Sequence, residues 1–87
     1  MRKKALGQIE ILSEYGRTLR EPYSKYVKDG IFEFRIKFAS DISRIFYFFY
    51  VGDNIVLTNG FIKKTQKTPS NEIEKAIKYK KDYERRN

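Results

Sequence analysis

The fold of this chain is decided by an alternating stretch, IFEFRIKF, which runs from Ile31 to Phe38. Every second residue from Phe32 onward is apolar, and the residues between them are charged. Because neighbouring side chains of a strand point to opposite faces, this pattern predicts a β-strand with one buried and one solvated face. The solvated face carries Glu33, Arg35 and Lys37, so the same stretch also presents two cations side by side.

Two further strands are predicted downstream. Residues 44–51 are almost entirely aromatic or aliphatic, as expected for a central strand that is buried on both faces. Gly52-Asp53-Asn54 supplies a turn, and residues 55–62 form the third strand, in which Asn59 and Gly60 mark a bulge or a close approach. We therefore expect a three-stranded antiparallel meander.

Helices are predicted on both sides of this meander. Residues 3–15 repeat apolar side chains at helical spacing and are followed by Gly16, whereas residues 17–30 are interpreted as a packed loop. The second helix is expected to begin with Thr68 as its N-cap and Pro69 as its first residue, and to run to about residue 84. The order of helix, loop, three strands and helix predicts a single α+β domain over residues 1–87.

Composition excludes several kinds of site. The chain has 87 residues and contains no cysteine and no histidine, so thiolate zinc sites, cysteine nucleophiles and imidazole acid–base chemistry are excluded. The longest apolar run, residues 45–51, is too short to span a membrane, and the basic N-terminus is not followed by the apolar core of a signal peptide. We expect a cytoplasmic protein without a membrane partner.

Basic charge is concentrated at the two ends of the chain, and most of it lies after the last predicted strand. The net charge is +8, and residues 63–87 contribute +5 of it, with nine basic residues against four acidic ones. Lys63, Lys64 and Lys67 lie between the last strand and the last helix. Such a field accelerates encounter with RNA or DNA and makes binding salt-dependent. The alternative interpretation of this segment is a flexible, solvated loop.

The residue types present suit RNA cleavage that needs no protein nucleophile. The 2′-hydroxyl of RNA attacks the adjacent phosphate once it is deprotonated and the charge of the phosphorane is stabilised. The guanidinium of arginine donates two parallel hydrogen bonds to phosphate oxygens, and lysine adds positive charge or transfers a proton. Arg35, Lys37 and Arg44 are therefore candidates for converging on one phosphate and stabilising its charge. The alternative for Arg35 and Lys37 is an ordinary solvated strand face. Tyr47 is a candidate for stacking on a base, with core packing as its alternative.

Five segments of the chain match a known pattern in the same order and spacing. They are Leu19–Tyr23, Asp29–Ile36, Ser43–Phe49, Gly60–Pro69 and Glu72–Glu74, and the most specific is the Gly-Phe-Ile-Lys-Lys-Thr-Gln-Lys-Thr-Pro sequence of residues 60–69. On these segments the chain resembles the RelE/HigB family of bacterial toxins, in its phage-related HigB-like branch. The resemblance runs from about residue 5 to residue 84.

The resemblance implies an endoribonuclease that cuts messenger RNA on the ribosome and so inhibits translation, with no metal and no cofactor. It also implies two partners, the message on the ribosome and a small helix-turn-helix antitoxin of the HigA type. Carried over by position, the basic strand residues of the family fall on Arg35, Lys37 and Arg44, and its cation after the strand falls on Lys63 or Lys64. Lys67 and Thr68 join Tyr47 as candidates for binding RNA. A histidine-dependent version of the mechanism does not transfer to this chain.

The N-terminus departs from the family pattern. Relatives usually begin with a strand and a helical stretch before the equivalent of residues 3–15, so we expect a RelE-like sheet that lacks this first strand. That departure and the missing histidine favour an alternative function, an inactive or truncated relative that binds antitoxin or RNA without cleaving it. The lysine-rich segment favours the nuclease. A purely structural protein has no need for cations aligned on adjacent strands.

Overall fold

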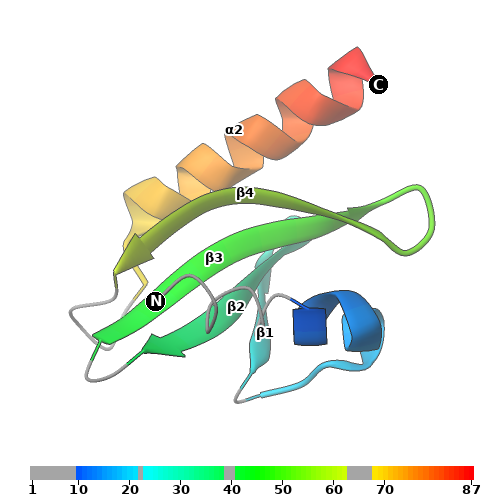
Figure 1. Ribbon diagram of the computed structural model, residues 1–87. Helices are drawn as coiled ribbons and strands as arrows, with labels where there is room; N and C mark the ends of the chain where they lie inside the picture. The colour runs from blue at the N-terminus through cyan, green and yellow to red at the C-terminus, as the bar shows by residue number, and fades with distance from the viewer. Residues whose placement is uncertain (1–9, 22, 39–40, 63–67) are drawn as a thin grey trace.

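The computed structural model describes residues 10–21, 23–38, 41–62 and 68–87, and its centre is one antiparallel sheet. The strands are paired in chain order, so each neighbour in sequence is also a neighbour in the sheet (Figure 1). They are β1 (Ser24–Lys28), β2 (Ile31–Phe38), β3 (Asp41–Tyr50) and β4 (Asn54–Ile62). β2 and β3 are therefore central, and β1 and β4 form the edges.

The sheet has four strands, so the predicted three-stranded meander is wrong. β1 lies within residues 17–30, which were predicted to be a packed loop, and it pairs with β2 through Ser24 opposite Phe34 and Tyr26 opposite Phe32. Asp29 and Gly30 join the two strands, with φ angles of 51° and 80°. Positive φ at both positions is the geometry of a two-residue hairpin turn, for which Asp-Gly is a preferred sequence.

The other predicted strands are confirmed with small shifts of their ends. β2 has the predicted bounds, β3 begins three residues earlier than predicted, and β4 begins one residue earlier. The register changes between β3 and β4, since Ile45 is opposite Gly60 whereas Tyr47 is opposite Leu57. The extra residue on β4 is the bulge that Asn59 and Gly60 predict.

Each face of the sheet packs against helical structure, which gives three layers (Figure 1). On one face, Leu12 from the helical residues 10–15 packs with Phe34, Ile36 and Tyr47. A 3-10 turn, η1 (Gly16–Thr18), follows that helix. On the other face, Ala76 from α2 (Ser70–Arg86) packs with a second buried cluster of Ile31, Phe46 and Phe48. In the described residues, no helix is long and apolar enough to cross a membrane.

The packing of α2 on the sheet changes the environment of β2. Ile31 and Glu33 point to the face that α2 covers, and only 4% of Glu33 is exposed. The prediction that β2 has one solvated face is therefore wrong at Glu33. It holds only toward the end of the strand, where Lys37 is exposed.

The start of α2 also differs from its prediction. Ser70 is the first helical residue, Pro69 occupies the N-cap position, and no side chain caps the helix. The Thr68 hydroxyl, predicted to be the cap, donates a hydrogen bond to Oε2 of Glu33 instead. As an N-cap the hydroxyl would accept a hydrogen bond from a helix N–H, whereas here it donates one to a carboxylate, and a hydrogen bond to an ionised group is the stronger kind.

Candidate active site

Two arginines face each other across the two central strands. Arg35 of β2 is directly opposite Arg44 of β3. Directly opposed residues of an antiparallel pair point to the same face, with Cβ atoms about 5 Å apart, and like charges in such a pair repel each other. Arg44 lies two residues before Phe46, so both guanidinium groups are on the side of the sheet that α2 covers. This arrangement requires a nearby anion.

Glu33 is the anion that balances Arg44. The Nε of Arg44 donates to Oε1 of Glu33 across 2.5 Å, and the exposed fractions of the two side chains are 13% and 4%. The second carboxylate oxygen accepts from the Thr68 hydroxyl across 2.8 Å. A buried ion pair is stable only when the remaining hydrogen-bonding positions are also filled. Glu33 therefore joins β2, β3 and the segment before α2 at one point.

Arg35 is held differently. Its side chain is half-buried, and its Nε is buried without an acceptor among the described residues. An unsatisfied buried donor is unfavourable, more so when it is charged, and a bound anion would relieve it. The neighbouring guanidinium of Arg44 adds to the attraction for an anion at this place. The pair is suited to a phosphate group, whose oxygens accept hydrogen bonds from several directions.

The other predicted cations divide into two groups. Lys37 is exposed and lies two residues after Arg35, on the same face of β2. Lys63, Lys64 and Lys67 lie outside the described residues. Of the predicted site residues, the structure thus brings Arg35, Lys37 and Arg44 onto one face, and Thr68 joins them through Glu33.

Tyr47 lies on the opposite face, in the core. It is 1% exposed, and its hydroxyl forms a short hydrogen bond with the hydroxyl of Ser24. Burial raises the pKa of Tyr47 above its ordinary value, and the hydrogen bond with Ser24 opposes that rise. A base cannot stack on a ring that is enclosed in this way, so the core-packing interpretation describes this residue.

Sequence reasoning missed two residues that shape the site. Glu33 was placed on a solvated face, and no feature of the alternating pattern distinguishes a solvated carboxylate from a buried one. Asn59, in the bulge, donates from Nδ2 to the carbonyl and to Oε1 of Glu72 across 3.2 and 3.0 Å. The bulge is thereby tied to the first turn of α2. Its sequence signal was the Asn-Gly pair, which predicts a bulge or a close approach but not the contact of Asn59 with α2.

Gly60 allows the close approach of β4 to the site. A Cβ atom built there would lie 3.2 Å from the carbonyl oxygen of Arg44 and 3.4 Å from Cγ1 of Ile45. Any larger side chain would push on the backbone that carries Arg44.

In the described part of the chain, nowhere do three or more His, Cys, Asp or Glu side chains gather in a way that could hold a metal ion. What the site does present is a set of guanidinium donors beside one buried carboxylate. Such donors stabilise negative charge that develops on a phosphoryl group.

Comparison with known proteins assigns the chain to a family. The family model described as Phage derived protein Gp49-like (DUF891) matches residues 1–81. The chain belongs to this family. The Gp49-like family is part of the RelE/HigB-like toxins, so the resemblance seen in the sequence is confirmed at that level. Membership implies a toxin of a toxin–antitoxin system and an antitoxin as its partner. Comparison with curated proteins gives no match.

Proposed function

We propose that this Gp49-like protein is a toxin that cleaves messenger RNA on the ribosome, without a metal, and that a helix-turn-helix antitoxin of the HigA type holds it inactive. The observation that carries the proposal is the opposed pair of Arg35 and Arg44. One of these cations is fixed by Glu33, and the other has a buried donor that no described residue accepts from. A phosphate of the message supplies the acceptor in this proposal.

The chemistry follows from the donors. The 2′-hydroxyl of the RNA attacks the adjacent phosphorus, the bond from phosphorus to the 5′-oxygen breaks, and negative charge grows on the non-bridging oxygens. Arg35 donates to one of these oxygens through Nε. Arg44 has its Nε occupied by Glu33 and Nη1 in a long 3.4 Å bond to the Ser43 carbonyl, so Nη2 is its donor for the second oxygen. Donors that are oriented before the reaction contribute most to stabilising such charge.

Lysines complete the proposed site. Lys37 extends the cationic face along β2, and Lys63 or Lys64 supplies the cation after β4 in this proposal. Lys67 holds the message backbone, and a lysine is the group that transfers protons, since histidine is absent from the chain. Thr68 acts through Glu33 and holds the residues that directly precede α2 beside Arg44.

One observation favours a second candidate function. Glu33 neutralises Arg44, and such a buried pair also occurs as a purely structural element. A protein in which Arg44 is structural would bind RNA or antitoxin on the same face and cleave nothing.

Primer-extension mapping of messenger RNA in a reconstituted translation reaction separates the two functions. The unmodified chain is compared with Arg35→Ala, with Arg44→Lys, which keeps the charge but loses the guanidinium fork, and with Lys28→Ala on β1 as the matched control. We expect cleavage to fall about 100-fold in Arg35→Ala, the usual effect of losing one charge-stabilising donor. Lys28→Ala should cleave at the unmodified rate.

Each outcome assigns a function. Cleavage by the unmodified chain that is lost in Arg35→Ala supports the nuclease and this site. Cleavage that persists in Arg35→Ala and Arg44→Lys places the site elsewhere. If the unmodified chain cuts nothing but binds the programmed ribosome or RNA, the binding module is correct and the nuclease is wrong.

A further inference from the structure

β1 starts beside the arginine pair of the candidate active site. The N–H of Arg35 donates a hydrogen bond to the carbonyl of Tyr23 across 2.9 Å, so the pairing of β1 with β2 continues one residue before Ser24, where β1 begins. Arg35 is also directly opposite Arg44. Tyr23 therefore lies in one row with the two arginines across the sheet.

The start of β1 presents two side chains on the face of the arginine pair. Ser24 points to the other face, since its hydroxyl forms a hydrogen bond with that of Tyr47. Successive residues of an extended chain point to opposite faces, so Tyr23 and Lys25 point away from that core. The register of the strands agrees, because Lys25 is directly opposite Glu33, and opposed residues share a face.

Both of these side chains are at the surface. Tyr23 is 56% exposed, and Lys25 is exposed as well. α2 runs along β4, the strand farthest from β1 (Figure 1). The Glu33 carboxylate opposite Lys25 is bound by Arg44 and Thr68, and Lys25 forms no ion pair with any described residue. Its charge is therefore available to a ligand.

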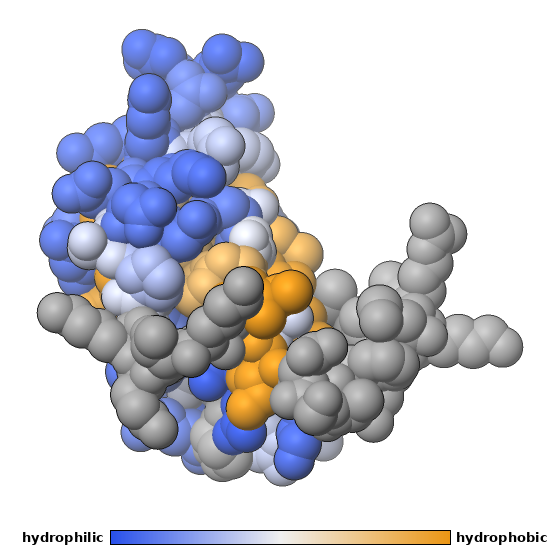
Figure 2. All heavy atoms as spheres, turned by 90° about the vertical axis from the view of Figure 1, so that its left-hand side faces the viewer, coloured by the Kyte–Doolittle hydropathy of each residue, from blue (hydrophilic) through white to orange (hydrophobic). Residues whose placement is uncertain are grey.

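The charge of this part of the sheet suits a polyanion. Around Glu33 it places four cations on three strands, namely Lys25, Arg35, Lys37 and Arg44. Figure 2 views the molecule from the end of the sheet at which β2 and β4 finish, and most of the surface drawn in colour there is hydrophilic. RNA carries one negative charge at each nucleotide, so cations on neighbouring strands can bind successive phosphates of one strand.

An exposed aromatic ring beside cations suits a single strand in particular. Unpaired bases stack on aromatic side chains, and such stacking tolerates any base because every base has a π-face. Tyr47, which was predicted to stack on a base, is enclosed in the core. Tyr23 instead offers an exposed ring next to Arg35 in the row.

We propose that the start of β1 binds the nucleotide of the message next to the cleaved bond, with Lys25 on its phosphate and the ring of Tyr23 against its base. The message then crosses the sheet from β3 over β2 to β1. Diagonal neighbours on adjacent strands have Cβ atoms about 7–8 Å apart, within reach of long side chains, so Arg35 and Lys25 can hold adjacent phosphates. The proposal rests on the proposed function for the identity of the cleaved phosphate, and it gives Lys25 and Tyr23 no part in the chemical step.

The test uses the full 87-residue chain and a short single-stranded RNA whose 2′-hydroxyls are methylated, so that it cannot be cleaved. Fluorescence anisotropy measures its Kd at several salt concentrations. Lys25→Ala should weaken binding severalfold and reduce the slope of log K against log salt by about 0.7, the contribution of one phosphate contact of a single strand. Tyr23→Ala should weaken binding about tenfold with the slope unchanged, whereas Tyr23→Phe keeps the ring and should bind like the unmodified chain.

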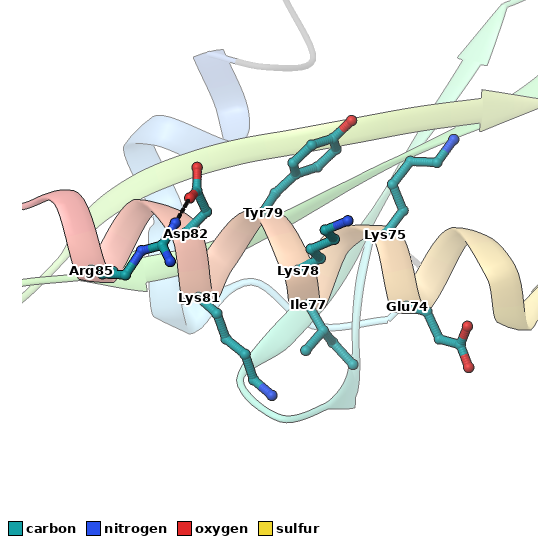
Figure 3. A pocket seen from close by; sticks show the side chains of 8 residues that line it. All are labelled: Glu74, Lys75, Ile77, Lys78, Tyr79, Lys81, Asp82 and Arg85. Atoms are coloured by element: carbon teal, nitrogen blue, oxygen red, sulfur yellow. Dashed lines mark hydrogen bonds and ion pairs between the residues drawn. The ribbon is translucent and has the colours of Figure 1, made fainter.

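Two control variants match these changes. Lys78→Ala removes the same charge from an exposed position, and Figure 3 shows the Lys78 side chain on the surface of α2. Tyr15→Ala removes a ring that is 53% exposed, from the helical residues 10–15 that pack on the other face of the sheet. Both variants should bind the RNA with the affinity and the salt slope of the unmodified chain.

Arg35→Ala separates this proposal from the proposed function. If Arg35→Ala weakens binding while Lys25→Ala and Tyr23→Ala behave like their controls, the site on β1 is wrong and the arginine pair stands. If Arg35→Ala binds normally while the two β1 variants bind weakly, the site on β1 is correct and the phosphate site at the arginine pair is wrong. An equal fall of the slope in Lys78→Ala, or no binding by the unmodified chain, also overturns the proposal.

Discussion

Glu33 and Arg44 form an ion pair between adjacent central strands, with Nε and Oε1 2.5 Å apart and with 4% and 13% of the side chains exposed. The pair lies on the face to which Arg35 also points, so this face of the sheet holds one buried carboxylate and two guanidinium groups. Arg44 therefore has two roles. It is a hydrogen-bond donor of the proposed site, and it is also the counter-charge of a buried carboxylate. A cleavage assay tests the first role, and an unfolding experiment tests the second.

Removing Arg44 should destabilise the fold strongly. Arg44→Ala leaves the Glu33 carboxylate buried without its cation, and we expect a loss of about 3–5 kcal/mol in the free energy of unfolding. Adding Glu33→Gln to this variant should restore part of the loss, since the side chain left buried without Arg44 is then neutral. Urea unfolding followed by circular dichroism measures all four members of the cycle.

The control for this cycle is the exposed ion pair of Arg17 and Asp53. Its atoms are 2.9 Å apart, but its side chains are 55% and 84% exposed. Exposed pairs contribute about 0–1 kcal/mol, so Asp53→Ala should change stability little. If Arg44→Ala were no more harmful than Asp53→Ala, the Glu33 carboxylate would be solvated in solution and the buried pair would be contradicted.

Thr68 should matter through its hydroxyl and not through its methyl group. Thr68→Val keeps the shape but removes the donor to Glu33, and hydrogen bonds to charged groups contribute about 1.5–3 kcal/mol. Thr68→Ser keeps the donor and should stay close to the unmodified stability. The same urea experiment compares the two, and equal losses in both would show that the hydroxyl has no role.

The alternation of residues 31–38 was enough to predict β2, its bounds and the common face of Arg35 and Lys37. It was not enough to predict the burial of Glu33, because burial depends on whether α2 covers that face, and the strand itself contains no information about the second layer. β1 was missed because its sequence, SKYVK, shows little apolar alternation, and its position in the sheet comes from pairing with β2. The Asp29-Gly30 turn was the local feature that pointed to it.

Gly60 gives a test of the contact between β4 and the site. In Gly60→Ala the new methyl group meets the Arg44 carbonyl at 3.2 Å, and overpacking of this kind costs about 1–3 kcal/mol. If the nuclease proposal is correct, the cleavage rate of Gly60→Ala should also fall, because the backbone of Arg44 moves. Gly52→Ala is the comparison, since its φ of 78° makes alanine unfavourable, but among the described residues no atom beyond its two chain neighbours lies within 4 Å of the new Cβ. Loss of stability in both with loss of cleavage only in Gly60→Ala is the expected result.

Stability should fall at alkaline pH because of Tyr47. Burial raises the pKa of Tyr47 in the folded chain above the ordinary value of 10.0 that applies in the unfolded chain. Between these two pKa values the unfolded chain has released the proton and the folded chain still holds it, so stability is fully present below pH 10 and is lost as the pH rises through the folded pKa. The experiment compares the unmodified chain with Tyr47→Phe, which lacks the ionisable hydroxyl. The free energy of unfolding of the variant should decline less steeply above pH 10 than that of the unmodified chain. Urea unfolding across that range measures the difference, and the tyrosinate absorbance of the unmodified chain minus that of Tyr47→Phe follows the ionisation of Tyr47 itself. Parallel declines in the two proteins would mean that Tyr47 is as accessible to water as an ordinary surface tyrosine.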